Sequence, residues 1–288
     1  MFFDTLPKSS PDKRTETLLL EDPIPERVSL TVATVNAWDG GSKASAFARY
    51  LATIASQSPD FIFVQEAPTM SHPAIVGVED RYEVVSLKTP DYDTGYERMM
   101  TLRRRDSPWR PKKGLKAIPF FSSECNTERV STLTPVAHPS GATARIANVH
   151  LCGGRFDEEF HCGQEESMND AKMSMLKQLL GEATIILGDF NSDFLAHQTP
   201  NDEKRLSFLQ GLGCSSETAQ LWHSLPYQAL VGRGFRRVPF TQPTSAFGTQ
   251  PDGIWYSSSV ELREQRVLDA LSSGASDHNG LMARFDVR

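Results

Sequence analysis

Residues 184–194, TIILGDFNSDF, combine a short apolar run with a cluster of acidic and amide residues. The apolar run Ile185 to Leu187 predicts a short buried strand, which runs directly into a turn carrying Asp189, Asn191 and Asp193. Ligands are held at strand ends in mixed α/β sheets, because the loops there present side chains from a rigid frame. The stretch therefore raises the question of what these carboxylate and amide groups bind.

Polar side chains recur in the same manner at other strand ends. Apolar segments end on Asn36 in TVATVN, on Glu66 in FIFVQE and on His150 in ARIANVH, while Asp277 and His278 stand just before GLMARF. For a single residue of this kind, a hydrogen-bonded cap or core edge is the commoner explanation. Five strand ends of this composition favour one shared site.

The hydrophobic periodicity predicts alternating strands and helices within one domain, residues 28–288, after a polar, proline-containing tail at 1–27. Strands are expected at 28–38, 60–67, 82–87, 98–103, 129–136, 144–151, 184–189, 253–257 and 281–287, and helices at 43–58, 166–180 and 204–212. In the helix at 166–180, the residues expected to face the core are Met168, Met175, Leu176, Leu179 and Leu180.

Composition places the chain among ordinary globular proteins. Of its 288 residues, 39% are hydrophobic and 23% are charged, and the net charge of −6 argues against generic adhesion to nucleic acid. No cationic start precedes an apolar run, and no segment approaches the roughly 18 apolar residues that cross a bilayer. We expect an intracellular, cytoplasmic or nuclear protein without signal peptide or transmembrane segment, assumed to be monomeric. The four cysteines lack the spacing of a zinc site, and reduced thiols are expected.

Six stretches, in this order, resemble the endonuclease/exonuclease/phosphatase superfamily, the fold of pancreatic deoxyribonuclease: VNAWDG, VQEA, NVHL, LGDFNSD, PDGIWYS and SDHNGL, between residues 35 and 281. The resemblance covers almost the whole body of the chain. It implies an α/β fold of two packed mixed β-sheets flanked by helices, a four-layer sandwich with the site at one edge. It also implies a hydrolase acting on phosphate esters with Mg²⁺ or Mn²⁺ as cofactor.

The resemblance assigns a role to each strand-end residue that faces the metal. Glu66 matches the family's metal carboxylate, and Asn36 and Asp277 would complete the metal side. A hard cation prefers oxygen ligands and keeps several waters, so one or two carboxylates suffice.

The resemblance also implies the catalytic roles. Asp189 matches the residue that aligns and deprotonates the attacking water, and Asn191 would hold the nucleophile or a phosphate oxygen, projecting the same way if the strand continues. His278 matches the histidine that donates to the phosphate, with Asp252 orienting its ring. His150 matches a second phosphate-contacting histidine.

Three residues outside these motifs are candidates for substrate binding. Trp109 lies in the basic stretch 98–116, which could track a phosphodiester backbone and stack a base, or could be a solvated hairpin. Arg155 follows His150 in a glycine-containing loop, and Arg236 lies in GRGFRRV. The expected activity is a phosphodiesterase that hydrolyses nucleic acid by in-line attack of water. The alternatives are a lipid or small-molecule phosphoesterase of the same fold, and an inactive binding scaffold.

Overall fold

The computed structural model describes residues 27–89, 98–122, 127–151, 165–197, 225–246 and 248–288. Several predictions fall outside these residues: the tail up to residue 26, the helix at 204–212, Arg155 and all four cysteines. The side chain of Met168 is also outside the description. No helix among the described residues is both long and apolar enough to cross a membrane.

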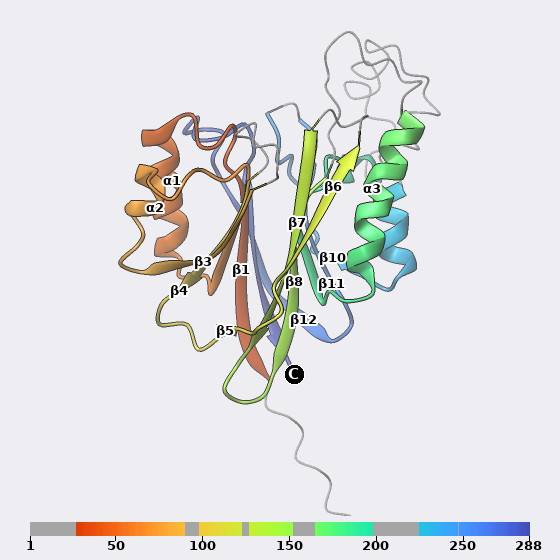
Figure 1. Cartoon of the computed structure of the whole chain (residues 1–288), viewed down its shortest axis with the longest axis horizontal. Helices are drawn as coiled ribbons and strands as arrows, with labels where there is room; N and C mark the ends of the chain where they lie inside the picture. Colours follow the sequence, from red (N-terminus) through yellow and green to blue (C-terminus); the bar gives the residue numbers. More distant parts are fainter. Residues whose placement is uncertain (1–26, 90–97, 123–126, 152–164, 198–224, 247) are drawn as a thin grey trace, which may run out of the picture.

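The first sheet has six strands in the order β12-β13-β1-β2-β4-β3. Its members are β1 (Val28–Asn36), β2 (Phe61–Gln65), β3 (Tyr82–Lys88), β4 (Met99–Arg104), β12 (Val260–Leu268) and β13 (Gly280–Val287). The β1 and β2 strands are parallel, and their other neighbours are antiparallel. Helices α1 (Ala44–Ser56) and α2 (Pro73–Val76) cover its outer face (Figure 1).

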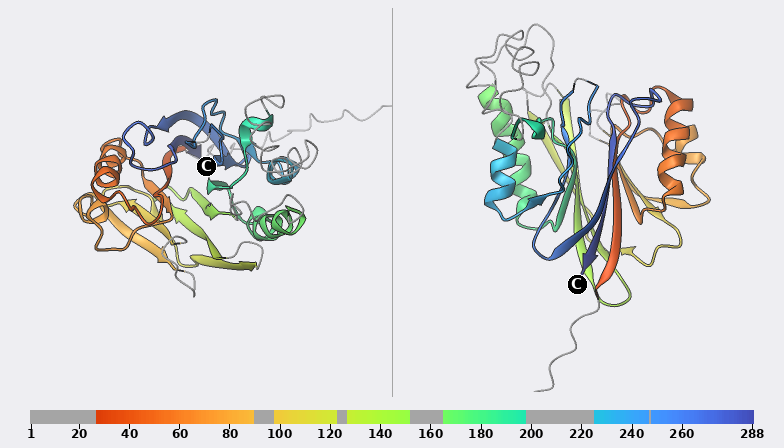
Figure 2. Two further views of the ribbon diagram at one scale, coloured as in Figure 1. Left: turned by 90° about the horizontal axis from the view of Figure 1, so that it is seen from above. Right: turned by 180° about the vertical axis from the view of Figure 1, so that it is seen from behind.

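The second sheet has seven strands in the order β10-β11-β9-β8-β7-β5, with β6 also paired to β7. Its members are β5 (Arg110–Pro111), β6 (Lys116–Ser122), β7 (Thr127–Ala137), β8 (Thr143–His150), β9 (Ile185–Asp189), β10 (Arg236–Arg237) and β11 (Asp252–Tyr256). Within it, β8 and β9 pair in parallel, and the other named strand pairs are antiparallel. Helix α3 (Glu165–Leu180) and the helical residues 225–232 cover its outer face (Figure 2), and a 3₁₀ turn follows β9 at Phe194–His197.

The hydrophobic core occupies three interfaces between these layers. Alternate residues of β1 illustrate the pattern, because Leu30 and Val32 pack between the sheets while Ala33 and Val35 pack beneath α1. A third cluster joins the second sheet to α3. Two packed mixed sheets with helices outside both form the four-layer α/β sandwich, and this confirms the predicted fold class.

Most predicted elements are present with bounds shifted by a few residues. The core face of α3 is confirmed at Met175, Leu176, Leu179 and Leu180, all of which are buried. The periodicity missed β6 and β12, the two-residue strands β5 and β10, and the short helix α2. In β12, five of the nine residues are exposed charged or amide side chains, so the strand lacks the alternation of apolar and polar residues that indicates a half-buried strand.

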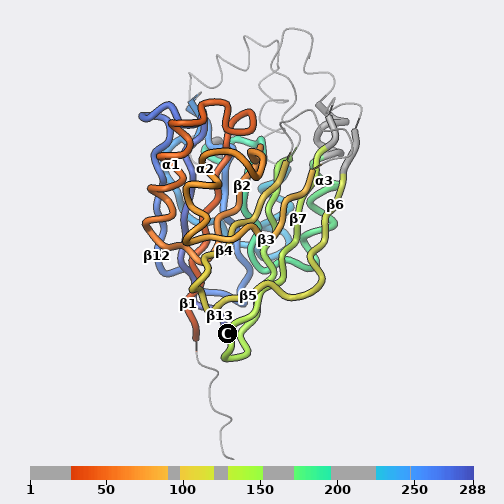
Figure 3. The backbone as a smooth tube through the Cα atoms, turned by 60° about the vertical axis from the view of Figure 1, so that its left-hand side comes forward, coloured from red at the N-terminus to blue at the C-terminus, as the bar shows by residue number. Residues whose placement is uncertain are grey.

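The strand register places the polar strand ends along one edge of the sandwich, the upper edge in Figures 1 and 3. Asn36 pairs with Gln65 in the first sheet, and His150 pairs with Asp189 in the second. Because both pairs are parallel, each presents its carboxyl-terminal residues at the same edge. Asp252, which begins the antiparallel strand β11, lies opposite Asp189 in this register.

Candidate active site

Asn36 links the two sheets at this edge. Its side-chain nitrogen Nδ2 donates to Glu66 Oε1 at 3.1 Å and to Asp189 Oδ2 at 3.2 Å. Its Oδ1 accepts a hydrogen bond from the backbone N–H of Trp38 at 2.8 Å. One buried amide group thereby joins the ends of β1, β2 and β9, so residues far apart in sequence meet as the pattern of strand ends predicted.

Glu66 follows β2 in the left-handed conformation, with φ of 48°. Its Oε2 accepts a hydrogen bond from the backbone N–H of Asp39 at 2.6 Å. Burial raises the pKa of Glu66, and the hydrogen bonds from Asp39 and Asn36 oppose this effect. Positive φ also occurs at Trp38, Asp39 and Asn191. Such conformations are uncommon for residues other than glycine, and four of the five among the described residues lie on loops that carry the site, the exception being Ser58.

Asp189 lies at the centre of the group and is buried. Its Oδ1 accepts a hydrogen bond from the backbone N–H of Asn191 at 2.7 Å, while Oδ2 faces Asn36. Burial raises the pKa of Asp189, and the nearby positive charge of His278 opposes the rise. The carboxylate is thus held in a fixed orientation with little water around it.

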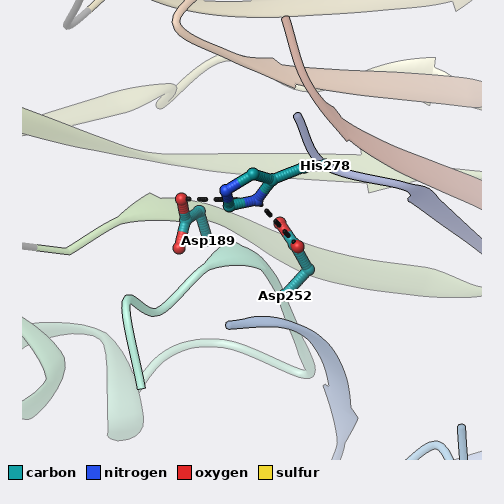
Figure 4. Close-up of side chains that lie close together, drawn as sticks. All are labelled: Asp189, Asp252 and His278. Atoms are coloured by element: carbon teal, nitrogen blue, oxygen red, sulfur yellow. Dashed lines mark hydrogen bonds and ion pairs between the residues drawn. The ribbon is translucent and has the colours of Figure 1, made fainter. Parts of the chain in front are cut away.

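His278 lies just before β13 and points at two carboxylates (Figure 4). Its Nδ1 is 2.9 Å from Asp252 Oδ2 and 3.8 Å from Asp189 Oδ2. Burial lowers the pKa of His278, but Asp252, Asp189 and Asp277 outweigh this effect and raise the pKa to about 10. The imidazole is therefore cationic at neutral pH.

His150 ends β8, and its ring is uncharged, unlike that of His278. Burial, the guanidinium of Arg129 and the charge of His278 hold its pKa well below the usual value, so the ring is neutral. Its Nε2 lies 3.7 Å from Glu66 Oε1 and 3.7 Å from Asp189 Oδ2. Arg129 Nη1 is 2.9 Å from Nδ1 and 3.0 Å from Nε2 of the same ring.

The side chain of Asn191 does not continue the direction of β9. The strand ends at Asp189, and Asn191 has a φ of 47° and donates from Nδ2 to Leu151 O at 2.8 Å. Asn191 was expected to project the same way as Asp189 if the strand continued, and this condition is not met, because the chain turns into the left-handed conformation. Its role at the phosphate stays a prediction.

A divalent cation suits the Glu66 side of the site. Glu66 presents carboxylate oxygens, and Asn36 would add Oδ1 once its amide turned, because it now directs Nδ2 at Glu66 and Asp189. A cation would offset the negative charge of the partly buried Glu66 and the buried Asp189. Asp189, Asp252 and His278 also converge, with one ligand atom of each within 4.8 Å of the others. Because His278 Nδ1 already shares a hydrogen bond with Asp252 Oδ2, we assign that trio to hydrogen bonding. Asp277 acts on His278 by its charge, and its role as a metal ligand stays a prediction.

No protein-family model and no curated protein matches the sequence, but solved structures match the fold. The endonuclease/exonuclease/phosphatase from Bacteroides vulgatus has a TM-score of 0.63 at 13% identity, over 91% of this chain and 100% of that chain. Zebrafish (D. rerio) TDP2 in complex with a single-strand DNA product gives 0.56 at 16% identity, over 89% and 98%. The inositol polyphosphate 5-phosphatase domain of SPsynaptojanin, with inositol (1,4)-bisphosphate and calcium ion, gives 0.55 at 14%, over 91% and 85%.

This chain has the endonuclease/exonuclease/phosphatase fold. The resemblance seen in the six sequence stretches and the similarity of the whole fold agree, because the stretches supply the strand ends along one edge of the sandwich. Asn36, Glu66, Asp189, Asp252 and His278 meet there through hydrogen bonds or ion pairs, and His150 lies against them.

Two of the residues predicted to contact substrate, Trp109 and Arg236, lie in the wrong place for that role. Trp109 is fully buried between the sheets, and its Nε1 donates to Ser29 O at 2.7 Å, so its ring cannot stack a base. Arg236 lies opposite Tyr256, at the end of β11 that is remote from Asp252, with its guanidinium 5.3 Å from the centre of the Tyr256 ring. Arg236 therefore lies near the strand ends opposite those that carry the site.

Sequence reasoning missed three side chains beside the site. Arg129 lies in β7, and nothing in the sequence of that strand indicates that this residue lies beside the site. Trp38, half-buried, belongs to the loop that contacts Asn36 and Glu66. Lys172 is fully buried, and here a signal exists, because it precedes Met175 and Leu176 by three and four residues and so falls on the apolar stripe of α3.

Proposed function

We propose that the protein is a divalent-metal-dependent phosphodiesterase that hydrolyses nucleic acid by in-line attack of water. The observation that supports it most strongly is the setting of Asp189. This buried carboxylate faces the amide of Asn36, the neutral ring of His150 and the cationic ring of His278. A base for water and donors for a phosphate thus lie within one small group of side chains, as phosphoryl transfer requires.

Asp189 is the base in this proposal. A carboxylate whose pKa is raised by burial accepts a proton from water more readily than an exposed one. The hydrogen bonds to Oδ1 and Oδ2 fix its orientation, so the water that it binds is held in one direction. Alignment of this kind supplies a large part of the rate in phosphoryl transfer.

His278 and Arg129 supply positive charge for the phosphate oxygens. Asp252 keeps His278 protonated and holds the ring from one side, which leaves the opposite nitrogen, Nε2, to donate a hydrogen bond. Arg129 lies against His150 and close enough to Glu66 to lower its pKa. Its guanidinium geometry matches two phosphate oxygens at once.

Glu66 and Asn36 are the residues proposed to hold Mg²⁺ or Mn²⁺, with Asp277 as a further candidate. A bound cation would neutralise the charge that develops on the phosphate oxygens. For Asn36 to offer Oδ1, its amide must give up the hydrogen bond from Trp38 N. The calcium ion in the complex of the inositol polyphosphate 5-phosphatase domain, which has the same fold, supports a divalent cation as cofactor.

The choice of nucleic acid rests on the TDP2 complex with single-strand DNA and on the loop around Trp38. Residues 38–41 all have positive φ, and the backbone N–H groups of Trp38 and Asp39 bond to Asn36 and Glu66. This fixes a half-buried indole beside the proposed metal ligands, with Lys43 Nζ 4.3 Å from the centre of its ring. Lys43 lies over one face of this ring, so a base would stack on the other face while the ammonium group offers a positive charge for its phosphate.

The second candidate is a phosphoesterase of a small molecule, which the bound inositol (1,4)-bisphosphate in the synaptojanin domain favours. Both candidates use the same base, cation and phosphate donors. They differ in what lies beyond the phosphate, where a nucleic acid needs a surface for bases and a polyol phosphate needs hydrogen-bond donors. Trp38 favours the first candidate.

The test is hydrolysis of a substrate panel with Mg²⁺ or with EDTA: single- and double-stranded DNA, poly(A) and mixed RNA, sphingomyelin and inositol phosphates. Each is assayed with the wild type, Asp189→Asn and the control Asp60→Asn. Asp60 is buried but remote from the site, and it accepts hydrogen bonds from Thr31 N and Ser107 Oγ. Its replacement is therefore expected to lower stability and to leave kcat unchanged. Metal-dependent cleavage of one nucleic acid that falls by at least about 10²-fold in Asp189→Asn supports the proposal. Cleavage of inositol phosphate or lipid alone overturns the substrate, and full activity of Asp189→Asn overturns the mechanism.

A further inference from the structure

Lys172 is a lysine in the interior of the protein. It lies on α3 with 0% of its side chain exposed, on the same stripe as the core residues Met175, Leu176 and Leu179. Placing an ammonium group in such surroundings is unfavourable unless it is paired or hydrogen-bonded. This ammonium group therefore needs a partner that the apolar core residues of α3 do not supply.

The ammonium group reaches the turn that follows the proposed base. Lys172 Nζ donates to the backbone oxygen of Asn191 at 2.5 Å and lies 3.4 Å from Ser192 Oγ. Burial lowers the pKa of Lys172 to about 7, and the negative charge of Asp189 opposes this effect. The group that attracts its charge is therefore the same carboxylate that is proposed to activate water.

The turn at Asn191 is held from several sides in the left-handed conformation. Asn191 has a φ of 47°, which is disfavoured for residues other than glycine. Its backbone N–H bonds to Asp189 Oδ1, and its side chain bonds to Leu151 O. Lys172 binds the backbone carbonyl of the same residue from the helix side. Together these bonds fix both the backbone of the turn and the orientation of the Asp189 carboxylate.

We propose that Lys172 is a positioning residue that clamps the left-handed turn at Asn191 and thereby fixes the orientation of the Asp189 carboxylate. The inference rests on the proposed function for its catalytic meaning, whereas the clamp itself is a statement about local structure. Lys172 has no contact with substrate in this proposal and acts through the turn. Its loss should therefore lower kcat and leave KM nearly unchanged, because substrate binding at other parts of the site persists.

The experiment compares Lys172→Met with Lys177→Met, a matched substitution at an exposed position on the same helix. The expected result is a 10- to 100-fold fall in kcat with KM within about threefold for Lys172→Met, and no change for Lys177→Met. Lys172→Arg, which keeps a buried cationic donor, should recover part of the lost kcat. An unchanged kcat in Lys172→Met, or an equal loss in Lys177→Met, overturns the proposal.

A second readout does not depend on activity. Hydrogen exchange followed by mass spectrometry reports the backbone N–H groups of residues 187–195. Faster exchange in this segment alone in Lys172→Met supports the clamp, whereas unchanged exchange there, or faster exchange spread over the whole core, overturns it. If the wild type hydrolyses none of the tested substrates, the proposed function fails, and exchange still decides whether Lys172 holds the turn.

The substitution Asn191→Gly provides a further check. Glycine adopts a positive φ without strain, so the turn should depend less on the clamp in this background. The expected result is that adding Lys172→Met to Asn191→Gly lowers kcat by less than about threefold, well below its effect in the wild type. Equal effects in both backgrounds would show that Lys172 acts independently of the turn, contrary to the proposal.

Discussion

His278 Nδ1 lies 2.9 Å from Asp252 Oδ2, although the two residues come from different sheets. Asp252 begins β11 in the seven-stranded sheet, and His278 precedes β13 in the six-stranded sheet. The pair connects the two sheets at this edge of the sandwich. Asn36 makes a second connection there, because it donates to both Glu66 and Asp189. The proposed site is thus also a set of contacts that holds the two sheets together.

Replacing Asp252 by Asn should return His278 to the neutral form at physiological pH. Asp252 is the main influence that raises the pKa of His278 to about 10, and burial lowers it once that carboxylate is gone. Histidine NMR signals followed from pH 5 to pH 11 would measure the change. We expect wild-type His278 to titrate near pH 10 and the variant to titrate several pH units lower.

The same pair predicts how stability depends on pH. A histidine with a raised pKa stabilises the folded state fully below its unfolded pKa, near 6.5, and this contribution is lost as pH rises through about 10. Urea unfolding should therefore show the gap in unfolding free energy between the wild type and Asp252→Asn narrowing from pH 6 to pH 10. A constant gap would contradict the assigned cause.

A divalent cation should raise the melting temperature through Glu66. A ligand present at about 100 times its Kd stabilises the folded state by about 2.7 kcal/mol, which is several degrees for a chain of this size. Scanning calorimetry with Mg²⁺, Mn²⁺ or EDTA would measure the shift in the wild type, in Glu66→Gln and in Glu79→Gln, which removes an exposed carboxylate. We expect the shift to vanish or shrink only in Glu66→Gln. An undiminished shift there would remove Glu66 from the proposed metal ligands.

The strand ends were predictable from the sequence because each is a local pattern. An apolar run that stops at Asn36, Glu66 or Asp189 is visible without knowing the fold, and the order of the stretches indicated which fold unites them. Burial of the core face of α3 followed from helical spacing in the same way.

The substrate contacts were not predictable because they depend on the tertiary structure. Trp109 looked like an exposed aromatic within a basic stretch, yet its ring fills the space between the sheets and its indole N–H reaches Ser29 O. Arg236 was placed by composition alone, and only the register of β10 on β11 shows that it lies at the remote end. The left-handed turn at Asn191 has only a weak signal in the sequence, because Asn is enriched at positive φ but adopts other conformations as well.

Trp38 should govern binding of nucleic acid more than turnover. Stacking of a base on an aromatic side chain contributes about 1–3 kcal/mol, so Trp38→Ala is expected to raise KM for single-stranded DNA or RNA by about 5- to 100-fold with a smaller change in kcat. Trp38→Phe should retain much of the affinity. The measurement is steady-state kinetics on the oligonucleotide that the wild type cleaves. An unchanged KM in Trp38→Ala would remove the indole from the substrate surface and favour a small phosphoester.

Gly188 is the residue of the GDFN stretch that tolerates no side chain, and its substitution tests the fold beneath the site. Its φ is 130°, and a Cβ atom there would lie 2.1 Å from Val149 O on the neighbouring strand β8. That contact is with backbone, so it can be relieved only by moving β8 and β9 apart at the point where His150 and Asp189 pair. Gly188→Ala is therefore expected to destabilise the protein by about 3 kcal/mol or more, measured by urea unfolding.

Gly181→Ala is the matched control, because a Cβ atom there meets nothing within 4 Å among the described residues. The unfolding free energy of this variant should stay within about 0.5 kcal/mol of the wild type. Equal stability of the two variants would show that the close approach of β8 and β9 is not required where they carry the site.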